Sequence, residues 1–127
     1  MNRPLTAALI VLLLSACVHR VERPEAVEST VITHAELERS EYHNLYDLIE
    51  ARRAIWLHQR GRSTINGQAA EIQVLFDDLR LGGISVLKTM SLDGIKSVRY
   101  VDPVAASARW GLGYGEGAIT ISSRDSL

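Results

Sequence analysis

The sequence is poor in three features on which small proteins often depend: cysteine, aromatic side chains and an excess of charge of one sign. Of 127 residues, one is cysteine and 6% are aromatic, and 14 basic side chains stand against 15 acidic ones. A single cysteine excludes an intramolecular disulfide, so the fold depends on burial of apolar side chains. Balanced charge without a basic stripe or interleaved aromatics excludes the footprint of a nucleic-acid-binding protein.

The sequence also lacks an apolar run long enough to span a bilayer. Its longest run, residues 5–14, is about half of the roughly 20 residues that a spanning helix needs. The run follows the basic Arg3 and ends at the small residues Ser15 and Ala16. This layout is typical of a secretory signal peptide. We therefore expect residues 1–16 to be a cleaved signal.

The residues around the single cysteine indicate a lipid anchor. Leu14, Ser15, Ala16 and Cys17 resemble the lipobox of bacterial lipoproteins, which implies cleavage before Cys17 and attachment of acyl chains such as palmitate to it. A lone cysteine in an exported chain needs a reason, and lipidation supplies one. Stable anchoring takes more than one chain, at about 0.8 kcal/mol per buried methylene. The alternative is an ordinary cleaved signal beside a small buried thiol.

The lipoprotein resemblance also predicts a location. Val18 stands where, in the sorting rule of enteric bacteria, aspartate would retain a lipoprotein at the inner membrane. The resemblance therefore implies an outer-membrane protein that faces the periplasm. Residues 17–32 are charged, aperiodic and interrupted by Pro24, which predicts a lipidated flexible tether.

Residues 33–124 show the patterns of one small α+β domain. Thr33 and Glu36 have capping-box spacing before a short helix. Leu45, Leu48 and Ile49 follow at helical steps, and residues 55–57 are expected to dock the end of that amphipathic helix.

The remaining patterns of the domain predict strands. Residues 71–81 predict a β-hairpin that turns at Asp77 and Asp78. Residues 95–101 alternate between apolar and polar side chains, and residues 118–122 are rich in β-branched side chains. Between these two strands, Asp102 and Pro103 predict the start of a short helix. We expect a mixed β-sheet with short helices.

In their order along the chain, these patterns resemble a known family. The alternating residues 95–101, the alanine-rich residues 103–108, the pair Trp110 and Gly111, and the strand at 117–124 resemble the plug domain of TonB-dependent outer-membrane receptors. Residues 44–49 resemble its early helix, and residues 73–82 resemble its hairpin. Asp78 stands where the family usually has glycine, and the chain ends without the barrel. The resemblance implies a stand-alone plug-like domain, and a receptor's transport function does not follow from the fold.

The segment before the domain is open to two interpretations. Thr30, Val31, Ile32 and Thr33 resemble the energy-coupling box that binds TonB by adding a strand to its sheet, which needs an extended segment with β-branched side chains. Alternatively, Val31 and Ile32 staple the start of the first helix. Coupling to TonB is a hypothesis at this point.

No residue pattern indicates catalysis, a cofactor or a metal. His34, His43 and His58 match no metal-ligand spacing. Gly113, Gly115 and Ala118 fit a dinucleotide fingerprint, but they precede a strand instead of opening a helix, so turn glycines are expected. Asp77 and Asp78 are best explained by a turn. We expect a protein that is not an enzyme.

The sequence therefore predicts a noncatalytic outer-membrane lipoprotein whose plug-like domain binds a partner protein or a ligand. The expected contacts are loops at residues 60–68, 77–83 and 111–117, with Asp77, Asp78, Trp110 and Tyr114 as candidate residues. TonB or an outer-membrane barrel protein is the expected partner, and a small-molecule ligand is unknown. The rival prediction is a structural or envelope-assembly lipoprotein that packs against a barrel or against its own copy.

Overall fold

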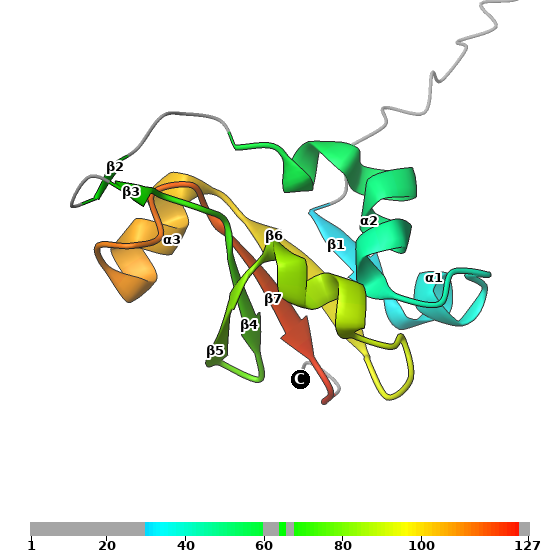
Figure 1. Cartoon of the computed structure of the whole chain (residues 1–127). Coiled ribbons are helices and arrows are strands. Elements are labelled where there is room, and N and C mark those ends of the chain that lie inside the picture. Colours follow the sequence, from blue (N-terminus) through cyan, green and yellow to red (C-terminus); the bar gives the residue numbers. More distant parts are fainter. Residues whose placement is uncertain (1–29, 60–63, 66–67, 125–127) are drawn as a thin grey trace, which may run out of the picture.

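The computed structural model describes residues 30–59, 64–65 and 68–124, which form a small α+β domain with short helices (Figure 1). The predicted signal peptide, Cys17, most of the tether and most of the loop at 60–68 lie outside these residues. The elements are, in chain order, β1 (Val31–Thr33), α1 (His34–Glu38), α2 (Leu45–Arg53), η2 (Ala54–Leu57), β2 (Thr64–Ile65), β3 (Gln68–Ala69), β4 (Gln73–Phe76), β5 (Leu79–Gly83), η3 (Ile84–Thr89), β6 (Ser97–Val101), α3 (Pro103–Trp110) and β7 (Ala118–Ser122).

The main sheet has five strands in the order β1-β6-β7-β4-β5. Strand β7 runs parallel to β4 and antiparallel to β6, and the remaining pairs are antiparallel, so the sheet is mixed as predicted. Strands β2 and β3 form a separate two-stranded ribbon. The two best-patterned strands, β6 and β7, therefore lie side by side at the centre of the main sheet.

One face of the sheet carries the main hydrophobic core. The helical segments α1, α2, η2 and η3 lie over this face and bury apolar side chains against it (Figure 1). From the sheet itself the core takes Ile32, Val74, Val98, Tyr100, Ile119 and Ile121; from the helical segments it takes Leu37, Leu45, Leu48, Ile49, Trp56 and Leu87. Because alternate residues of a strand point to opposite faces, this core uses every second position of β6 and β7.

The second face of the sheet is covered over part of its area by α3. A smaller cluster of Leu75, Ala106, Tyr114 and Ala118 forms beneath this helix, with Val101 and Trp110 packed against it. Asp102 caps α3 as predicted, because its Oδ1 accepts hydrogen bonds from the N–H groups of Val104 at 2.9 Å and Ala105 at 3.1 Å. The helix crosses one end of the sheet, and the rest of this face stays open.

The predictions for the first helices were right in outline and wrong at two positions. Leu45, Leu48 and Ile49 of α2 are fully buried as expected. Thr33 occupies the N-cap position of α1, but its side chain makes no capping hydrogen bond. Ile55 is 40% exposed, so it does not dock with its neighbour Trp56, which is buried. The tight η2 turn points successive side chains in different directions, and Ile55 points outward.

The first strand begins earlier than the domain boundary drawn from the sequence. Val31 and Ile32, which we assigned to the tether, pair with Arg99 and Val98 of β6. Ile32 is fully buried and belongs to the same core cluster as Leu37 of α1. This arrangement agrees with the staple interpretation, in which an apolar side chain before the N-cap packs against the fourth helical residue.

Candidate functional site

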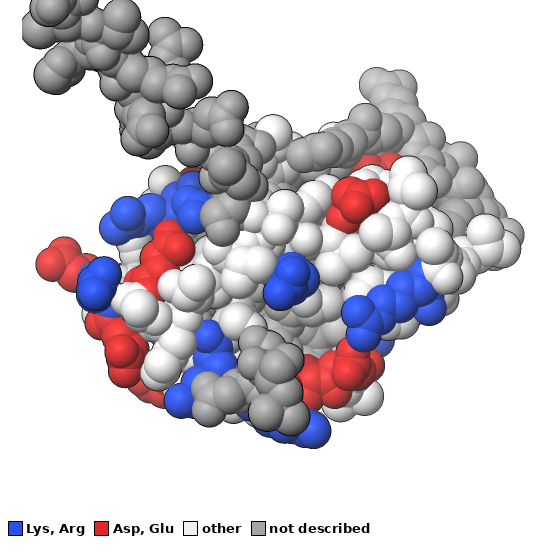
Figure 2. Space-filling view, turned by 180° about the vertical axis from the view of Figure 1, so that it is seen from behind, with Lys and Arg blue, Asp and Glu red and all other residues white. Residues whose placement is uncertain are grey.

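The candidate site is a hollow of about 250 Å³ on the open face of the sheet, beside α3. Figure 2 shows this side of the molecule, where basic and acidic side chains lie mostly around the border of a largely uncharged surface. The lining comes from β6 and β7, from the β4–β5 turn, from α3 and from the residues after β7; it comprises Asp77, Asp78, Ser97, Arg99, Val101, Arg109, Thr120, Ile121, Ser122 and Arg124. Three of these ten residues are arginines, and two are aspartates.

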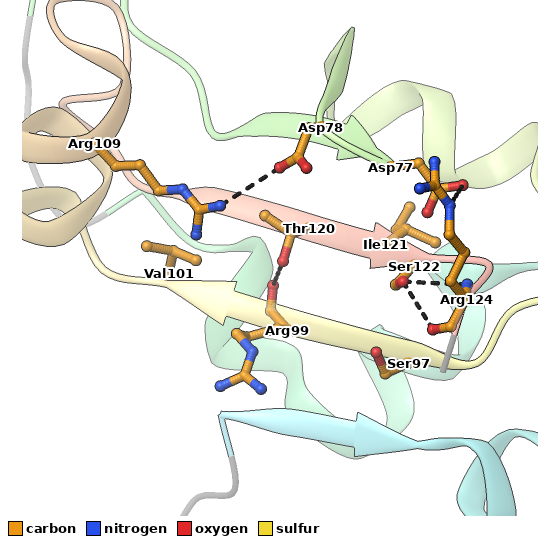
Figure 3. A pocket seen from close by; sticks show the side chains of 10 residues that line it. All are labelled: Asp77, Asp78, Ser97, Arg99, Val101, Arg109, Thr120, Ile121, Ser122 and Arg124. Atoms are coloured by element: carbon orange, nitrogen blue, oxygen red, sulfur yellow. Dashed lines mark hydrogen bonds and ion pairs between the residues drawn. The ribbon is translucent and has the colours of Figure 1, made fainter. Parts of the chain in front are cut away.

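The hairpin turn places both aspartates at the rim of the hollow (Figure 3). Asp77 and Asp78 have φ values of 45° and 69°, so both lie in the left-handed region. A two-residue hairpin turn of this kind requires positive φ at both central positions, and aspartate is among the residues that tolerate it. The predicted hairpin is confirmed, and aspartate at position 78 is compatible with it.

Asp77 is held from the C-terminal end of β7. Its Oδ1 accepts a hydrogen bond of 3.0 Å from the N–H of Ser123, and its Oδ2 accepts one from the Ser123 hydroxyl. These bonds lower the pKa of Asp77, the hydroxyl bond most, and the guanidinium of Arg124 adds to the effect. The Asp77 carboxylate therefore links the turn to β7, and Arg124 Nε lies 4.0 Å from it.

Asp78 makes a looser contact across the hollow. Its Oδ1 lies 3.5 Å from Nη2 of Arg109, and the two side chains are 76% and 64% exposed. Ion pairs this exposed contribute about 0–1 kcal/mol, because water screens them and both side chains lose freedom. Figure 3 shows Arg109 reaching over β7 from α3 toward the turn. A charged group of a ligand can therefore replace one partner of this pair with a small loss of free energy.

Arg109 also contacts Trp110, one of the two aromatic residues that the sequence singled out. Its guanidinium lies 4.8 Å from the ring centre of Trp110, and the Trp110 and Tyr114 rings are 5.3 Å apart. Arg80 lies 5.6 Å from the ring centre of Tyr114 on the same side of the sheet. Such contacts fix an arginine by attraction to the ring face. Tyr114 is buried and packs under α3, so of these two aromatics Trp110 has the greater exposure.

Arg99 stands apart from the other two arginines of the hollow. It lies on β6 with its side chain on the open face, opposite Thr120 of β7 and Val31 of β1 in the register of the sheet. The Thr120 hydroxyl donates a 3.4 Å hydrogen bond to the Arg99 carbonyl. Within the part of the chain that the structure describes, the Arg99 guanidinium has neither an ion pair nor a hydrogen bond. It is an exposed cation beside the polar side chains of β7.

The structure brings some of the predicted contact residues together and separates others. Asp77 and Asp78 line the hollow, and Trp110 joins them through Arg109. Thr30 to Thr33 lie along the edge of the sheet, where residues 31–33 form β1. The Thr30 carbonyl accepts a 2.9 Å hydrogen bond from the Tyr100 N–H. This segment therefore belongs to the folded sheet.

Sequence reasoning missed the three arginines of the hollow. Arg99 had a usable signal, because it occupies a polar position in the cleanly alternating strand at 95–101. Arg109 and Arg124 had none, since their positions depend on how α3 crosses the sheet and on where β7 ends. The hollow exists because residues far apart in sequence meet on one face.

The hollow presents charged side chains and hydrogen-bonding side chains. In the described part of its lining there is no histidine or cysteine, and Asp77 and Asp78 are engaged with different partners, Ser123 and Arg109. Among the described residues no group of three or more His, Cys, Asp or Glu side chains is placed to hold a metal ion. His34 contacts the Ile95 carbonyl through Nδ1 at 3.1 Å and Glu38 through Nε2 at 3.3 Å, away from this hollow.

Comparisons of the chain with protein-family models, with curated proteins and with solved structures found no match. In the described ranges, no helix has the length and apolar character needed to cross a membrane.

Proposed function

We propose that the protein is a noncatalytic lipoprotein of the bacterial outer membrane whose domain binds a partner protein or ligand in the periplasm. The observation that carries the proposal is the unequal covering of the sheet. Helical segments bury one face, whereas α3 leaves much of the other face open as a hollow lined by charged side chains. A folded surface with exposed, weakly paired charges, and without a catalytic constellation among the described residues, fits recognition better than turnover.

The anchor and the plug-like character belong to the same proposal. Support for the anchor comes from the lipobox-like residues 14–17, and support for the plug comes from the resemblance of residues 44–49, 73–82 and 95–124 to that family. The early helix, the hairpin and the two adjacent strands joined through an alanine-rich helix all lie within one small α+β domain. Cys17 would hold this domain near a membrane-embedded barrel protein.

Energy coupling through TonB is a narrower form of the proposal. Residues 31–33 pair with β6, so TonB would have to add to the outer edge of β1 or displace β1 from the sheet. Displacement would expose Ile32, which is fully buried. Strand addition at the outer edge leaves the core intact and is the form of coupling that we propose to test.

A scaffold role is the second candidate, and it rests on exposed apolar side chains away from the hollow. Leu79 is 67% exposed, Val104 80% and Leu112 96%. Side chains of this size at a surface favour packing against another protein. In this case the hollow would be incidental, and the contact would run through β5 and the two ends of α3.

Photo-crosslinking in living cells tests the proposal with a matched pair of positions. A benzophenone amino acid replaces Thr120, inside the hollow, or Glu50, exposed on α2 over the opposite face. We expect position 120 of the full lipidated chain to capture a defined envelope protein, identified by mass spectrometry, and position 50 to capture none of it. Equal capture from both positions would contradict binding at the open face.

Two further positions separate the candidates. A crosslinker at Thr30 should recover TonB if coupling occurs, and one at Leu112 should recover a barrel or envelope protein if the domain is a scaffold. Labelled palmitate should be incorporated into the unmodified chain and not into Cys17→Ala. Equal incorporation of palmitate into both chains would refute the lipid anchor at Cys17.

A further inference from the structure

The charged side chains of the open face differ in how fully they are paired within the chain. This difference indicates the chemistry of the partner that the face would bind. The Asp77 carboxylate is held by two hydrogen bonds from Ser123 and its side chain is 19% exposed, so it is well paired. The Arg124 side chain is 81% exposed and lies 4.0 Å from Asp77, which makes that contact loose. Arg124 is therefore less fully paired than Asp77.

The three arginines differ in how easily an anion reaches them. Arg99 has a free guanidinium among the described residues, while Arg109 and Arg124 each hold a weak, exposed contact with an aspartate. A guanidinium is planar, is always charged and offers paired donors that match a carboxylate. A carboxylate at Arg99 would gain a charge-assisted bond without breaking an existing one. Carboxylates at Arg109 or Arg124 would exchange with Asp78 or Asp77.

The arrangement of the arginines distinguishes between anionic partners. Figure 3 shows Arg109 and Arg124 at opposite ends of the hollow, with Arg99 on the border away from the two aspartates. A phosphate group is best bound by cations that converge on one point, whereas separated cations suit carboxylates spaced along an extended chain. The two aspartates also repel a dense anionic surface such as a lipid headgroup layer.

The hydroxyl groups along the same strands favour an extended peptide. Ser97 and Ser122 face each other across β6 and β7, and Thr120 lies opposite Arg99. These positions follow the direction of the strands and line the hollow. The Thr120 and Ser122 hydroxyls already donate to backbone carbonyls of the chain. Their oxygens can still accept hydrogen bonds from the N–H groups of a segment that lies along the strands.

We infer that the open face binds an acidic segment of a partner protein, with Arg99 as the primary contact and with Arg109 and Arg124 as exchangeable contacts. The inference rests on the proposed function, since it names the chemistry of the partner that the hollow receives. The negative charge of an acidic segment is complementary to the three arginines of the hollow. The Asp78 side chain then acts as an internal competitor for Arg109.

Binding of a fluorescein-labelled peptide of alternating glutamate and threonine to the full chain in detergent micelles tests the inference. We expect saturable binding that weakens as salt is raised, because exposed charges are screened. Arg99→Gln should weaken binding about tenfold or more, the loss typical of a charge-assisted hydrogen bond. Arg99→Lys should restore part of it. Arg52→Gln, on the exposed side of α2, is the matched control and should leave binding unchanged.

One variant should act in the opposite direction. Asp78→Asn removes the internal competitor and should tighten binding of the peptide about two- to fivefold, which is the range expected when an exposed ion pair is released. A general loss of folding cannot produce tighter binding, so this result separates the inference from a structural effect. Thermal unfolding of each variant verifies that the fold is retained.

Three results would overturn the inference. One is equal loss of peptide binding for Arg99→Gln and Arg52→Gln, and another is weaker binding for Asp78→Asn. The third is binding of inorganic phosphate or phosphatidylglycerol vesicles as tight as that of the peptide and with the same dependence on Arg99, which would assign the hollow to phosphate groups. Capture at position 120 in the crosslinking experiment together with any of these results would leave partner binding intact and reject its acidic chemistry.

Discussion

The two faces of the main sheet are built from the same strands and have opposite characters. On β7, Ile119 and Ile121 are buried under the helical segments, while Thr120 and Ser122 line the hollow on the other side. On β6, Val98 and Tyr100 alternate with Ser97 and Arg99 in the same way. The alternation separates two tasks within a few residues: one face stabilises the domain, and the other presents charge.

A domain this small can keep one face of its sheet open because the other face supplies most of its stability. The helix-covered face contributes most of the buried apolar area, which is worth about 25 cal/mol per Å² removed from water. The second cluster, under α3, is smaller and has four buried members. Charged residues on the open face therefore add little to stability.

Neighbouring substitutions on β7 give the strongest test of this division. Ile119→Ala should lower the free energy of unfolding by about 2–5 kcal/mol, because it leaves a cavity in the main core. Thr120→Ala, one residue along the same strand, should lower it by less than about 1 kcal/mol, mainly through reduced β propensity. Urea unfolding of the full chain measures both, and similar losses would mean that the open face also carries the fold.

A second test compares two glycines that lie on either side of Tyr114. Gly117 and Gly113 both have positive φ, at 94° and 109°. A Cβ at Gly117 would lie 2.8 Å from the Val101 carbonyl oxygen, whereas a Cβ at Gly113 would meet nothing within 4 Å. Alanine at either position carries a backbone strain of about 1–2 kcal/mol.

Gly117→Ala should therefore cost more than Gly113→Ala, by the roughly 1–3 kcal/mol typical of overpacking. The Val101 carbonyl is backbone of a central strand, so it cannot move aside as a side chain would. Chemical denaturation of the two variants gives the difference directly. Equal losses would mean that the backbone at Gly117 can move away from β6 without a loss of stability. The loop after α3 would then be only loosely attached to the sheet.

The helix-covered face could be predicted from the sequence, because each of its signals is local. Helical spacing identified Leu45, Leu48 and Ile49, and alternation identified β6. The errors fell where tertiary contacts decide. Thr33 forms no cap although the spacing fits, and Val31 pairs with β6 although its segment was assigned to the tether.

The open face could be predicted in part. Asp77 and Asp78 were recognised as a turn from their sequence, but nothing local shows that Asp77 bonds to Ser123 or that Asp78 faces Arg109. Those contacts depend on the parallel pairing of β4 with β7 and on the path of α3 over the sheet. Periodicity gives the face on which a residue lies, and topology decides what stands opposite it.

The smallest expected effect concerns Asp77, which joins the charged face to the end of β7. Because hydrogen bonds from the Ser123 hydroxyl and N–H, with the charge of Arg124, lower its pKa in the folded chain, the folded state binds a proton less readily than the unfolded state. The stabilisation is present above the unfolded pKa, near pH 4, and disappears as the pH falls through the lowered folded pKa. Stability should therefore decline below about pH 4.

Asp77→Asn should remove this part of the decline, because the amide does not titrate. The variant should be less stable than the unmodified chain at pH 7, and the two should converge in strong acid, as measured by urea unfolding across the pH range. Ser123→Ala offers a matched intermediate, since it deletes the hydroxyl donor and keeps the N–H donor, and it should retain part of the pH dependence. An unchanged acid decline in Asp77→Asn would mean that the β4–β5 turn is not held to β7 by this carboxylate, and the rim of the hollow would then be mobile.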